Sequence, residues 1–279
     1  MDDPSSSPSD ALQQKSNQLI DLLRGYGSCA VAFSGGLDSS VLAKAAVLAL
    51  GEQAVAFTAH GPSMPGGELD AAVAVAEAVG IRHEVIRTDE LADPRYQANT
   101  PERCYFCKQT ICRAIAERAR ELGLAVVVDG ANVDDRCDHR PGSRAARELG
   151  VRGPLAECEF DKNALRELAR HWQLSTWDKP ASPCLSSRVA YGVPITEGRL
   201  AMIDRAERFL REHGFPIVRV RLHEGDLARV EVPVGELPRL LEPALREALT
   251  EHLRECEFRR VTIDLAGFRS GSLNEGLDS

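Results

Sequence analysis

The stretch CAVAFSGGLDSS, residues 29–40, decides the fold class of this chain. The apolar run at 29–33 is typical of a buried strand, and residues 39–50 are rich in Ala, Leu and Val, as in a helix. Gly35 and Gly36 stand between the two and allow the backbone to approach a ligand closely. This order predicts an anion-binding loop, because backbone N–H groups and the helix N-terminus face the turn.

The alternation of strand and helix continues along the chain. Short apolar runs predict further strands over 54–59, 83–88 and 125–130. Helical patterns lie between them, over 67–79 and 110–122. Strands separated by helices favour an α/β fold with a parallel sheet covered on both faces. Ligands of such sheets bind beyond the carboxyl ends of the strands.

The loop SGGLDSS carries polar groups that suit a bound phosphate, and it resembles the PP-loop of ATP pyrophosphatases, which implies ATP. Asp38 would be repelled by a bare phosphate and is expected to bind the Mg²⁺ that accompanies it. The loop lacks the lysine of the Walker pattern, so a P-loop NTPase is not predicted. An ordinary strand-to-helix turn with a serine N-cap is the alternative. The residues predicted to bind ATP here are Ser34, Gly35, Gly36, Asp38, Ser39 and Ser40.

A second polar patch follows the strand expected at 125–130. It consists of DGANVDD at 129–135 and HRPG at 139–142. Acidic residues at the carboxyl end of a strand suit Mg²⁺, and an arginine suits phosphate. We therefore expect Asp129, Asn132 and Arg140 to contribute to the ATP site; a solvated acidic turn is the alternative.

Cys104 and Cys107 form a CxxC motif, which stands just before the helix expected at 110–122. The motif alone is compatible with a redox pair, half of a zinc site or ligands of an iron–sulfur cluster. Ordinary buried thiols are the alternative. A further cysteine, Cys184, stands in the segment KPASPCLSSR.

Pro183 favours an extended loop around Cys184, and the nearby Lys179 and Arg188 would favour its thiolate. Three cysteine ligands would leave one iron of a 4Fe–4S cluster open, since a fully ligated cluster takes four thiolates.

Composition limits the class of protein further. The net charge of −8 argues against a nucleic-acid partner. Eight cysteines in a chain without an export signal suggest a reducing cytoplasm. No apolar run of about 18 residues occurs, so no membrane-spanning segment is expected. The first residues, MDDPSSSPSD, are acidic and rich in Ser and Pro, and a disordered tail is expected over 1–15.

Two domains are expected after that tail, an ATP-binding domain over 16–193 and a small α+β domain over 194–279. The second contains a helix, two strands, a helix and a strand, with Thr196 as the N-cap of the first helix. HEGDL between the two strands favours a hairpin. The elements are expected over 196–213, 217–222, 228–232, 237–254 and 258–265.

Arg219 and Arg221 alternate on the first of these strands, so they point to the same face, where they would suit a substrate phosphate. A solvated strand face is the alternative. Glu207, on the preceding helix, is expected to face the same pocket. Arg269 and Ser270 are expected to close the site, with a surface turn as the alternative.

Seven segments together resemble the ATP-dependent sacrificial sulfur transferase LarE family, over nearly the whole chain. They are SGGLDSS, CYFCK, DGANVDD, HRPG, KPASPCLSSR, the VRVR strand and GFRSGSLN. SGGLDSS alone resembles the PP-loop of all ATP pyrophosphatases, whereas PCLSSR and GFRSGSLN are much narrower. The resemblance implies that ATP adenylates a carboxylate of pyridinium-3,5-biscarboxylic acid mononucleotide and releases pyrophosphate. Sulfur then yields a thiocarboxylate, in the synthesis of the nickel-pincer nucleotide cofactor.

The resemblance also implies site residues and a homo-oligomer. In the best-known members a single cysteine, matching Cys184, gives up its sulfur and becomes dehydroalanine. The additional Cys104 and Cys107 resemble the three-cysteine variant, in which a 4Fe–4S cluster held by all three carries a transferable sulfide. The three are therefore expected to be both catalytic residues and cluster ligands. Substrate-binding residues are expected at Arg188, Glu207, Arg219, Arg221, Arg269 and Ser270.

Three other functions are compatible with parts of the pattern. A cluster-dependent tRNA thiolase also pairs a PP-loop with three cysteines, but the acidic charge and the PCLSSR segment argue against it. A ligase of the NAD synthetase type would not need the cysteines. A regulatory module that only senses ATP or a metal should release no pyrophosphate with any acid.

Overall fold

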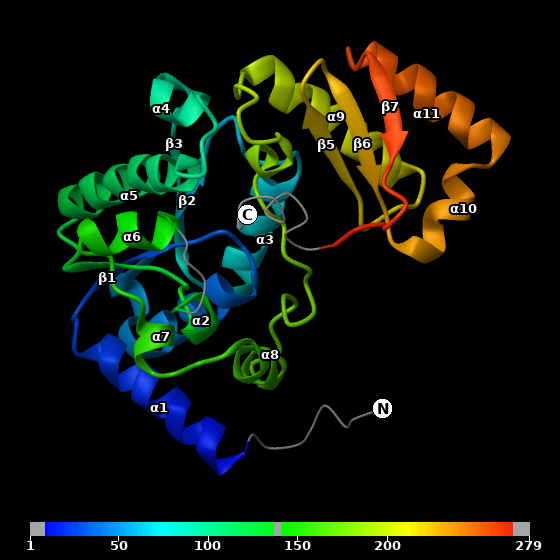
Figure 1. Ribbon diagram of the computed structural model, residues 1–279. Helices are drawn as coiled ribbons and strands as arrows, with labels where there is room; N and C mark the ends of the chain where they lie inside the picture. Colours follow the sequence, from blue (N-terminus) through cyan, green and yellow to red (C-terminus); the bar gives the residue numbers. More distant parts are fainter. Residues whose placement is uncertain (1–8, 137–140, 270–279) are drawn as a thin grey trace. The chain divides into compact units, whose positions relative to one another are not determined.

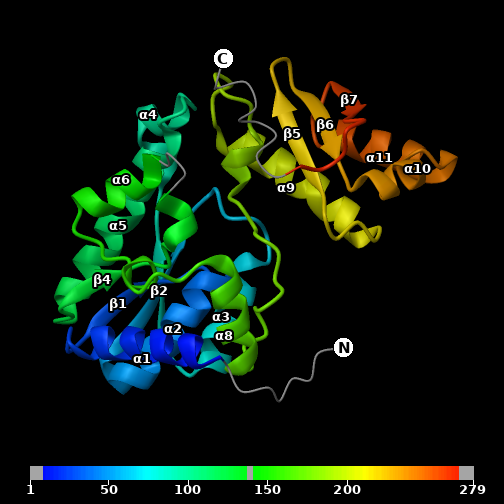
Figure 2. The same ribbon diagram turned by 60° about the horizontal axis from the view of Figure 1, so that its bottom comes forward.

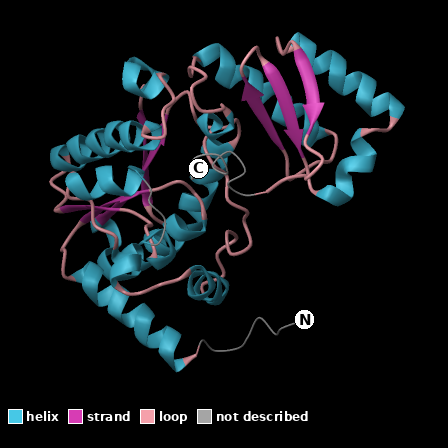
Figure 3. Ribbon diagram, viewed as in Figure 1, coloured by secondary structure: helices cyan, strands magenta, loops and turns pink. Residues whose placement is uncertain are grey.

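The computed structural model describes residues 9–136 and 141–269, and the chain divides into two compact units. The first unit comprises the residues up to Gly61, Gly67–Glu90 and Cys104–Ser182. The second comprises Pro62–Gly66, Leu91–Arg103 and the residues from Pro183 onward. Figure 1 labels their elements, and Figure 3 separates helices from strands. The sequence predicted one boundary after residue 193, whereas the chain crosses between the units repeatedly and last does so after Ser182.

A four-stranded parallel sheet forms the centre of the first unit, in the order β3-β2-β1-β4. In this register Cys29 lies opposite both Ala54 and Val126. The predicted α/β class and the predicted strands are confirmed. The strands are β1 (Cys29–Ala32), β2 (Ala54–His60), β3 (Arg82–Arg87) and β4 (Val126–Val128).

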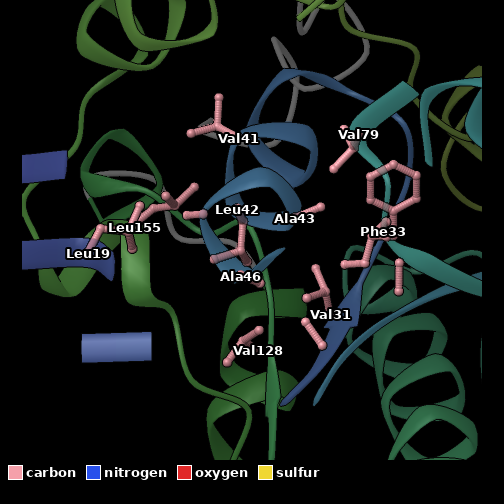
Figure 4. Close-up of a cluster of buried hydrophobic side chains, with 14 of the residues drawn as sticks. Leu19, Val31, Phe33, Val41, Leu42, Ala43, Ala46, Val79, Val128 and Leu155 are labelled. Carbon is pink, nitrogen blue, oxygen red and sulfur yellow. The ribbon is translucent and has the colours of Figure 1, made fainter. Parts of the chain in front are cut away.

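Helices cover both faces of this sheet, as its strand sequences require (Figure 2). Alternate residues of β1 enter different cores: Val31 packs with Leu19, Leu42 and Val128 on one face (Figure 4). Ala30 packs against α5 on the other. The first face carries α1 (Asp10–Arg24), α2 (Leu37–Leu50), α3 (Glu68–Val79) and α8 (Lys162–His171). The second carries α5 (Arg103–Glu121) and α6 (Pro141–Glu148), and a short helix α7 spans Pro154–Glu157.

Helices α1 and α5 include residues that the sequence analysis did not assign to helices. The hydroxyl of Ser9 accepts a hydrogen bond from the amide of Leu12 and caps α1, whose Leu12, Leu19 and Leu23 are buried. Residues 10–15 are therefore helical and do not belong to a disordered tail. Helix α5 begins at Arg103, so the CxxC motif lies within its first turns and not before it.

The second unit has the predicted helix–strand–strand–helix–strand order. Strands β5 (Arg219–His223) and β6 (Leu227–Glu231) form the expected antiparallel hairpin, and β7 (Arg260–Ile263) pairs parallel to β6. Thr196 caps α9 (Glu197–Glu212), as predicted. The remaining helices are α4 (Pro94–Gln97), α10 (Leu237–Leu240) and α11 (Pro243–Glu255). In both units, no helix among the described residues is long and apolar enough to cross a membrane.

One long helix was predicted over 237–254, and the structure has α10 and α11 instead. Glu242 has an extended backbone with ψ 130° because Pro243 follows it, and a residue before proline is disfavoured in helical conformation.

Candidate active site

The glycine loop joins β1 to α2 as the sequence predicted. Gly35 has φ +66°, and a Cβ atom at this position would lie 2.7 Å from the Cα atom of Ala72 on α3. The position therefore requires glycine for its conformation and for its space. Within the described chain no side chain caps the N-terminus of α2 at Gly36, which leaves its first amides directed toward the loop.

Serines stabilise the shape of the loop. The Ser40 hydroxyl donates to the carbonyl of Gly36 at 2.7 Å, and the Ser39 hydroxyl lies 3.2 Å from that of Ser34. A helix N-terminus with uncapped amides and clustered hydroxyls suits a phosphate group.

The loop after β4 lies directly against the glycine loop. A Cβ atom at Gly130 would be 3.1 Å from both the Cβ atom of Asp38 and the amide nitrogen of Ser39. The two loops meet because β4 lies beside β1 in the sheet, where the strand order reverses. Asp129 and Asn132 flank this glycine in the same loop, and their contribution to an ATP site stays a prediction. Arg140 lies outside the described residues.

Two buried polar atoms in this region have no hydrogen-bond partner among the described residues. They are Oδ1 of Asp38 and Nδ2 of Asn132, and Asn132 is fully buried. Burial raises the pKa of Asp38, although the hydrogen bond from Lys162 opposes the shift. Unpartnered buried polar groups are costly, so both atoms are suited to a ligand. The carboxylate suits Mg²⁺, which prefers oxygen ligands.

Three lysines surround the loop, each paired with a carboxylate. Lys162, at the start of α8, bonds Asp38, and Lys108 on α5 lies 2.8 Å from Asp129. Lys179 lies 3.1 Å from Glu68 and 3.3 Å from the carbonyl oxygen of Gly35.

The sequence analysis missed Lys108 and Lys162, and it associated Lys179 with Cys184. The available signals were weak: Lys108 directly follows the CxxC motif, and Lys162 directly follows Asp161, a residue type that favours a helix N-cap. Burial by itself would lower the pKa of Lys108, but Asp129 and Cys112 raise it above the usual value, so this side chain is a cation. Lysine side chains thus lie near the loop although the Walker lysine is absent, and each is paired with a carboxylate.

The cysteines are divided between the units. Cys104 and Cys107 lie one turn apart on α5, in the first unit, so they share one side of that helix. Cys184 belongs to the second unit and has the predicted extended backbone, with φ −62° and ψ 155°. Across the described ranges, no three His, Cys, Asp or Glu side chains gather as metal ligands would. The predicted 4Fe–4S cluster is therefore untested and stays a prediction.

Arg188 and Glu207 form an ion pair inside the second unit. Nε of Arg188 donates to Glu207 at 2.9 Å, and the side chains are 1% and 0% exposed. Nη1 of Arg188 also donates to the carbonyl oxygens of Pro183 and, at 2.8 Å, of Cys184. Glu207 also accepts from the amide of Val220 at 3.1 Å. The pair holds the backbone on either side of Cys184, and its predicted contact with substrate stays a prediction.

The two arginines of β5 have different surroundings. Arg221 is buried and pairs with Glu231 at 2.9 Å. Arg219 lies with its guanidinium carbon 5.3 Å from the ring centre of Phe268, and burial together with Arg188 lowers its pKa to about 10. Arg219 is therefore still a cation at neutral pH. Arg269 is exposed after β7, and Ser270 lies outside the described residues.

The parallel sheet and the glycine loop with its acidic residue define a PP-loop domain of the ATP pyrophosphatase type. In agreement with this, the profile of the asparagine synthase family matches residues 20–131, which contain the loop and the whole sheet.

Two relatives align with nearly the full length of this chain. The chain is 37% identical to pyridinium-3,5-bisthiocarboxylic acid mononucleotide synthase from Lactiplantibacillus plantarum, over 95% of this chain and 96% of the relative. It is 42% identical to an uncharacterised protein of Synechocystis, over 95% and 99% of the two chains. A tRNA-specific 2-thiouridylase of Maricaulis maris is 30% identical over 54% of this chain and 46% of its own. The chain belongs to the LarE family, which the synthase represents.

Proposed function

We propose that this protein uses ATP to activate a carboxylate of pyridinium-3,5-biscarboxylic acid mononucleotide and then replaces a carboxylate oxygen with sulfur. The product is a thiocarboxylate, in the synthesis of the nickel-pincer nucleotide cofactor. The observation that supports this most is the half-buried Asp38, whose buried Oδ1 atom has no partner among the described residues at the loop where phosphate would bind. The identity of 37% with the synthase covers the chain almost completely.

In the first step, a substrate carboxylate oxygen attacks the α-phosphorus of ATP. The bond from this phosphorus to the bridging oxygen breaks, and pyrophosphate leaves with the electron pair. The amides at the start of α2 and the hydroxyls of Ser34, Ser39 and Ser40 would bind the departing pyrophosphate. Lys108, Lys162 and Lys179 would neutralise its charge. Mg²⁺, held by Asp38 with Asp129 nearby, would supply further charge neutralisation.

In the second step, a sulfur nucleophile attacks the carbonyl carbon of the adenylate, and AMP leaves with the electron pair of the broken C–O bond. We assign this sulfur to sulfide delivered at Cys184. Cys104 and Cys107, with Cys184, are the proposed ligands of a 4Fe–4S cluster, which would supply the sulfide when bound, so that no bond within Cys184 has to break. Substrate phosphate would bind at Arg219 and Arg221, with Arg188, Glu207, Arg269 and Ser270 as the other proposed contacts.

A direct test measures pyrophosphate release and the mass of the nucleotide product with the purified full-length protein, ATP and Mg²⁺. We expect release that depends on the dicarboxylate substrate, and a product in which sulfur has replaced oxygen. Pyrophosphate release without any such product, or no release, would refute the proposal. Pyrophosphate release that instead depends on tRNA would favour the function of a tRNA thiolase. The 2-thiouridylase to which this chain is similar aligns with only about half of it.

The source of the sulfur is tested separately, by iron and acid-labile sulfide analysis after anaerobic purification. About four irons in the wild type, lost in Cys104→Ala, Cys107→Ala and Cys184→Ala, are the expected result. Cys158→Ala is the control, because this half-buried thiol has no proposed role. An iron-free protein whose Cys184 becomes dehydroalanine on turnover would instead establish sacrificial chemistry and remove the proposed role of the CxxC motif.

A further inference from the structure

The segment that carries Cys184, residues 183–193, has little regular structure beyond a short 3₁₀ turn at Leu185–Arg188. Its backbone is nevertheless held by buried side chains from elsewhere in the second unit. Arg103 donates to the carbonyl oxygen of Ser186 at 2.9 Å. The hydroxyl of Tyr96 lies 2.5 Å from that of Ser186, so the segment is bonded through its side chains as well.

Asn99 is the centre of these contacts. Its Nδ2 atom lies 3.3 Å from the carbonyl oxygen of Val189 and 2.8 Å from those of Ala190 and Val193. Its Oδ1 atom accepts from Nη1 of Arg103 at 2.6 Å. Asn99 is fully buried, and the two side chains therefore form one hydrogen-bonded group inside the unit.

The backbone conformation of Asn99 supports a specific requirement for this residue. Its φ is +51°, in the left-handed region that most residues with a side chain avoid and that asparagine tolerates. A buried amide that satisfies several carbonyl groups is expensive to remove, because the carbonyls that lose it stay desolvated. Asn99 thus combines a rare backbone conformation with a polar group that only asparagine places there.

The contacts fix the backbone around Cys184 without engaging its thiol. The carbonyl oxygen of Cys184 accepts from the Ser187 amide at 3.0 Å, from the Ser187 hydroxyl at 2.6 Å and from Arg188 at 2.8 Å. The half-buried thiol of Cys184 has no hydrogen bond with any part of the chain that the structure describes. A fixed backbone with an unengaged thiol is the arrangement that a residue positioned for sulfur delivery needs.

We propose that Asn99 and Arg103 are positioning residues for Cys184, which hold its segment so that the sulfur reaches the activated carboxylate. This inference rests on the proposed function, because it assigns the sulfur step to Cys184. Neither residue lies at the glycine loop, so adenylation should not depend on them. A displacement of about 1 Å at a reacting group can cost about 100-fold in rate, and the loss should appear in the sulfur step alone.

The test compares Asn99→Gly with the wild type in the full-length protein. Glycine accepts a positive φ, so this variant removes the amide without straining the backbone. Gln173→Gly is the matched control, because Gln173 is exposed and has φ +56°. We expect pyrophosphate release within about twofold of the wild type and a fall of about tenfold or more in thiocarboxylate. An equal fall in both steps, or no fall in either, would overturn the positioning role.

A second measurement separates this inference from the proposed function. The rate at which iodoacetamide alkylates Cys184, followed by peptide mass spectrometry, needs no substrate. We expect a change of severalfold at Cys184 in Asn99→Gly and none at Cys158. Should that variant not fold, Arg103→Lys provides the same comparison, because lysine keeps the charge but loses the planar fork. Unchanged alkylation in a folded variant refutes the inference, whereas a wild type without thiocarboxylate refutes only the proposed function.

Discussion

Nζ of Lys162 bonds Oδ2 of Asp38, although the two residues are 124 positions apart in the sequence. The other carboxylate oxygen of Asp38 is buried and has no partner among the described residues. One oxygen is therefore balanced by a cation, while the other is directed into the site. This carboxylate is suited to exchange its lysine for a metal ion when a phosphate arrives to accept the lysine.

Replacement of Asp38 by Asn should abolish pyrophosphate release without lowering stability. Burial raises the pKa of Asp38, so the folded protein holds this proton more tightly than the unfolded chain does. The associated stability is present at low pH and is lost as pH rises through the folded pKa. The melting temperature of the variant relative to that of the wild type should therefore increase as the pH rises above about 4. A melting temperature of the variant that instead falls relative to that of the wild type as the pH rises would contradict the environment described for Asp38.

Replacement of Lys162 by Gln should slow pyrophosphate release by about 100-fold, because a positioned cation at the leaving group is removed. Steady-state rates at saturating ATP, with the melting temperature alongside, provide the measurement. Lys44→Gln, on the neighbouring helix α2, is the control and should retain its activity. A similar loss in both variants would show that general charge, and not position, matters.

Replacement of Gly35 by Ala should cost more stability than replacement of Gly27 by Ala. Both glycines have positive φ, which costs an alanine about 1–2 kcal/mol. A Cβ atom at Gly27 would meet nothing within 4 Å, whereas one at Gly35 would lie 2.7 Å from the Cα atom of Ala72. Chemical denaturation should show an additional loss of about 1–3 kcal/mol for Gly35→Ala. ATP binding should be lost in Gly35→Ala alone. Equal losses of stability in the two variants would show that α3 moves to accommodate the added Cβ atom.

Replacement of Arg219 by Ala should raise the KM for the dicarboxylate nucleotide by about 10- to 100-fold, the range for a lost charge-assisted hydrogen bond. The affinity for ATP should not change. Arg260→Ala, an exposed arginine on β7, is the control. Should ATP affinity fall in parallel, the defect would lie in folding and the substrate role of Arg219 would be wrong.

The sequence predicted the strands and the glycine loop because both depend on neighbouring residues. CAVAF alternates between two cores, and the conformation of Gly35 is local. The lysines could not be assigned in this way. Lys162 reaches Asp38 only because α8 packs against α2. The spacing of residues in the sequence does not predict that helix contact.

The site of the second unit was least accessible to sequence reasoning. Arg188 and Glu207 have the charges expected of substrate contacts, but their pairing with each other, at 1% and 0% exposure, could not be predicted from the sequence. Asn99 carried no recognisable motif, because its role depends on backbone carbonyls, which every residue has. Polar residues that bind backbone groups give the weakest sequence signals.

The repeated crossing of the chain between the two units limits how the protein can be divided. A polypeptide cut after Ser182 would keep Leu91–Arg103 but lose the segment that Asn99 binds, and the remaining fragment would lack Asn99. The two pieces are therefore not independent modules that can be exchanged between relatives. During synthesis Asn99 leaves the ribosome 90 residues before Val189. The hydrogen bonds of its side-chain amide can therefore form only after most of the protein has been synthesised.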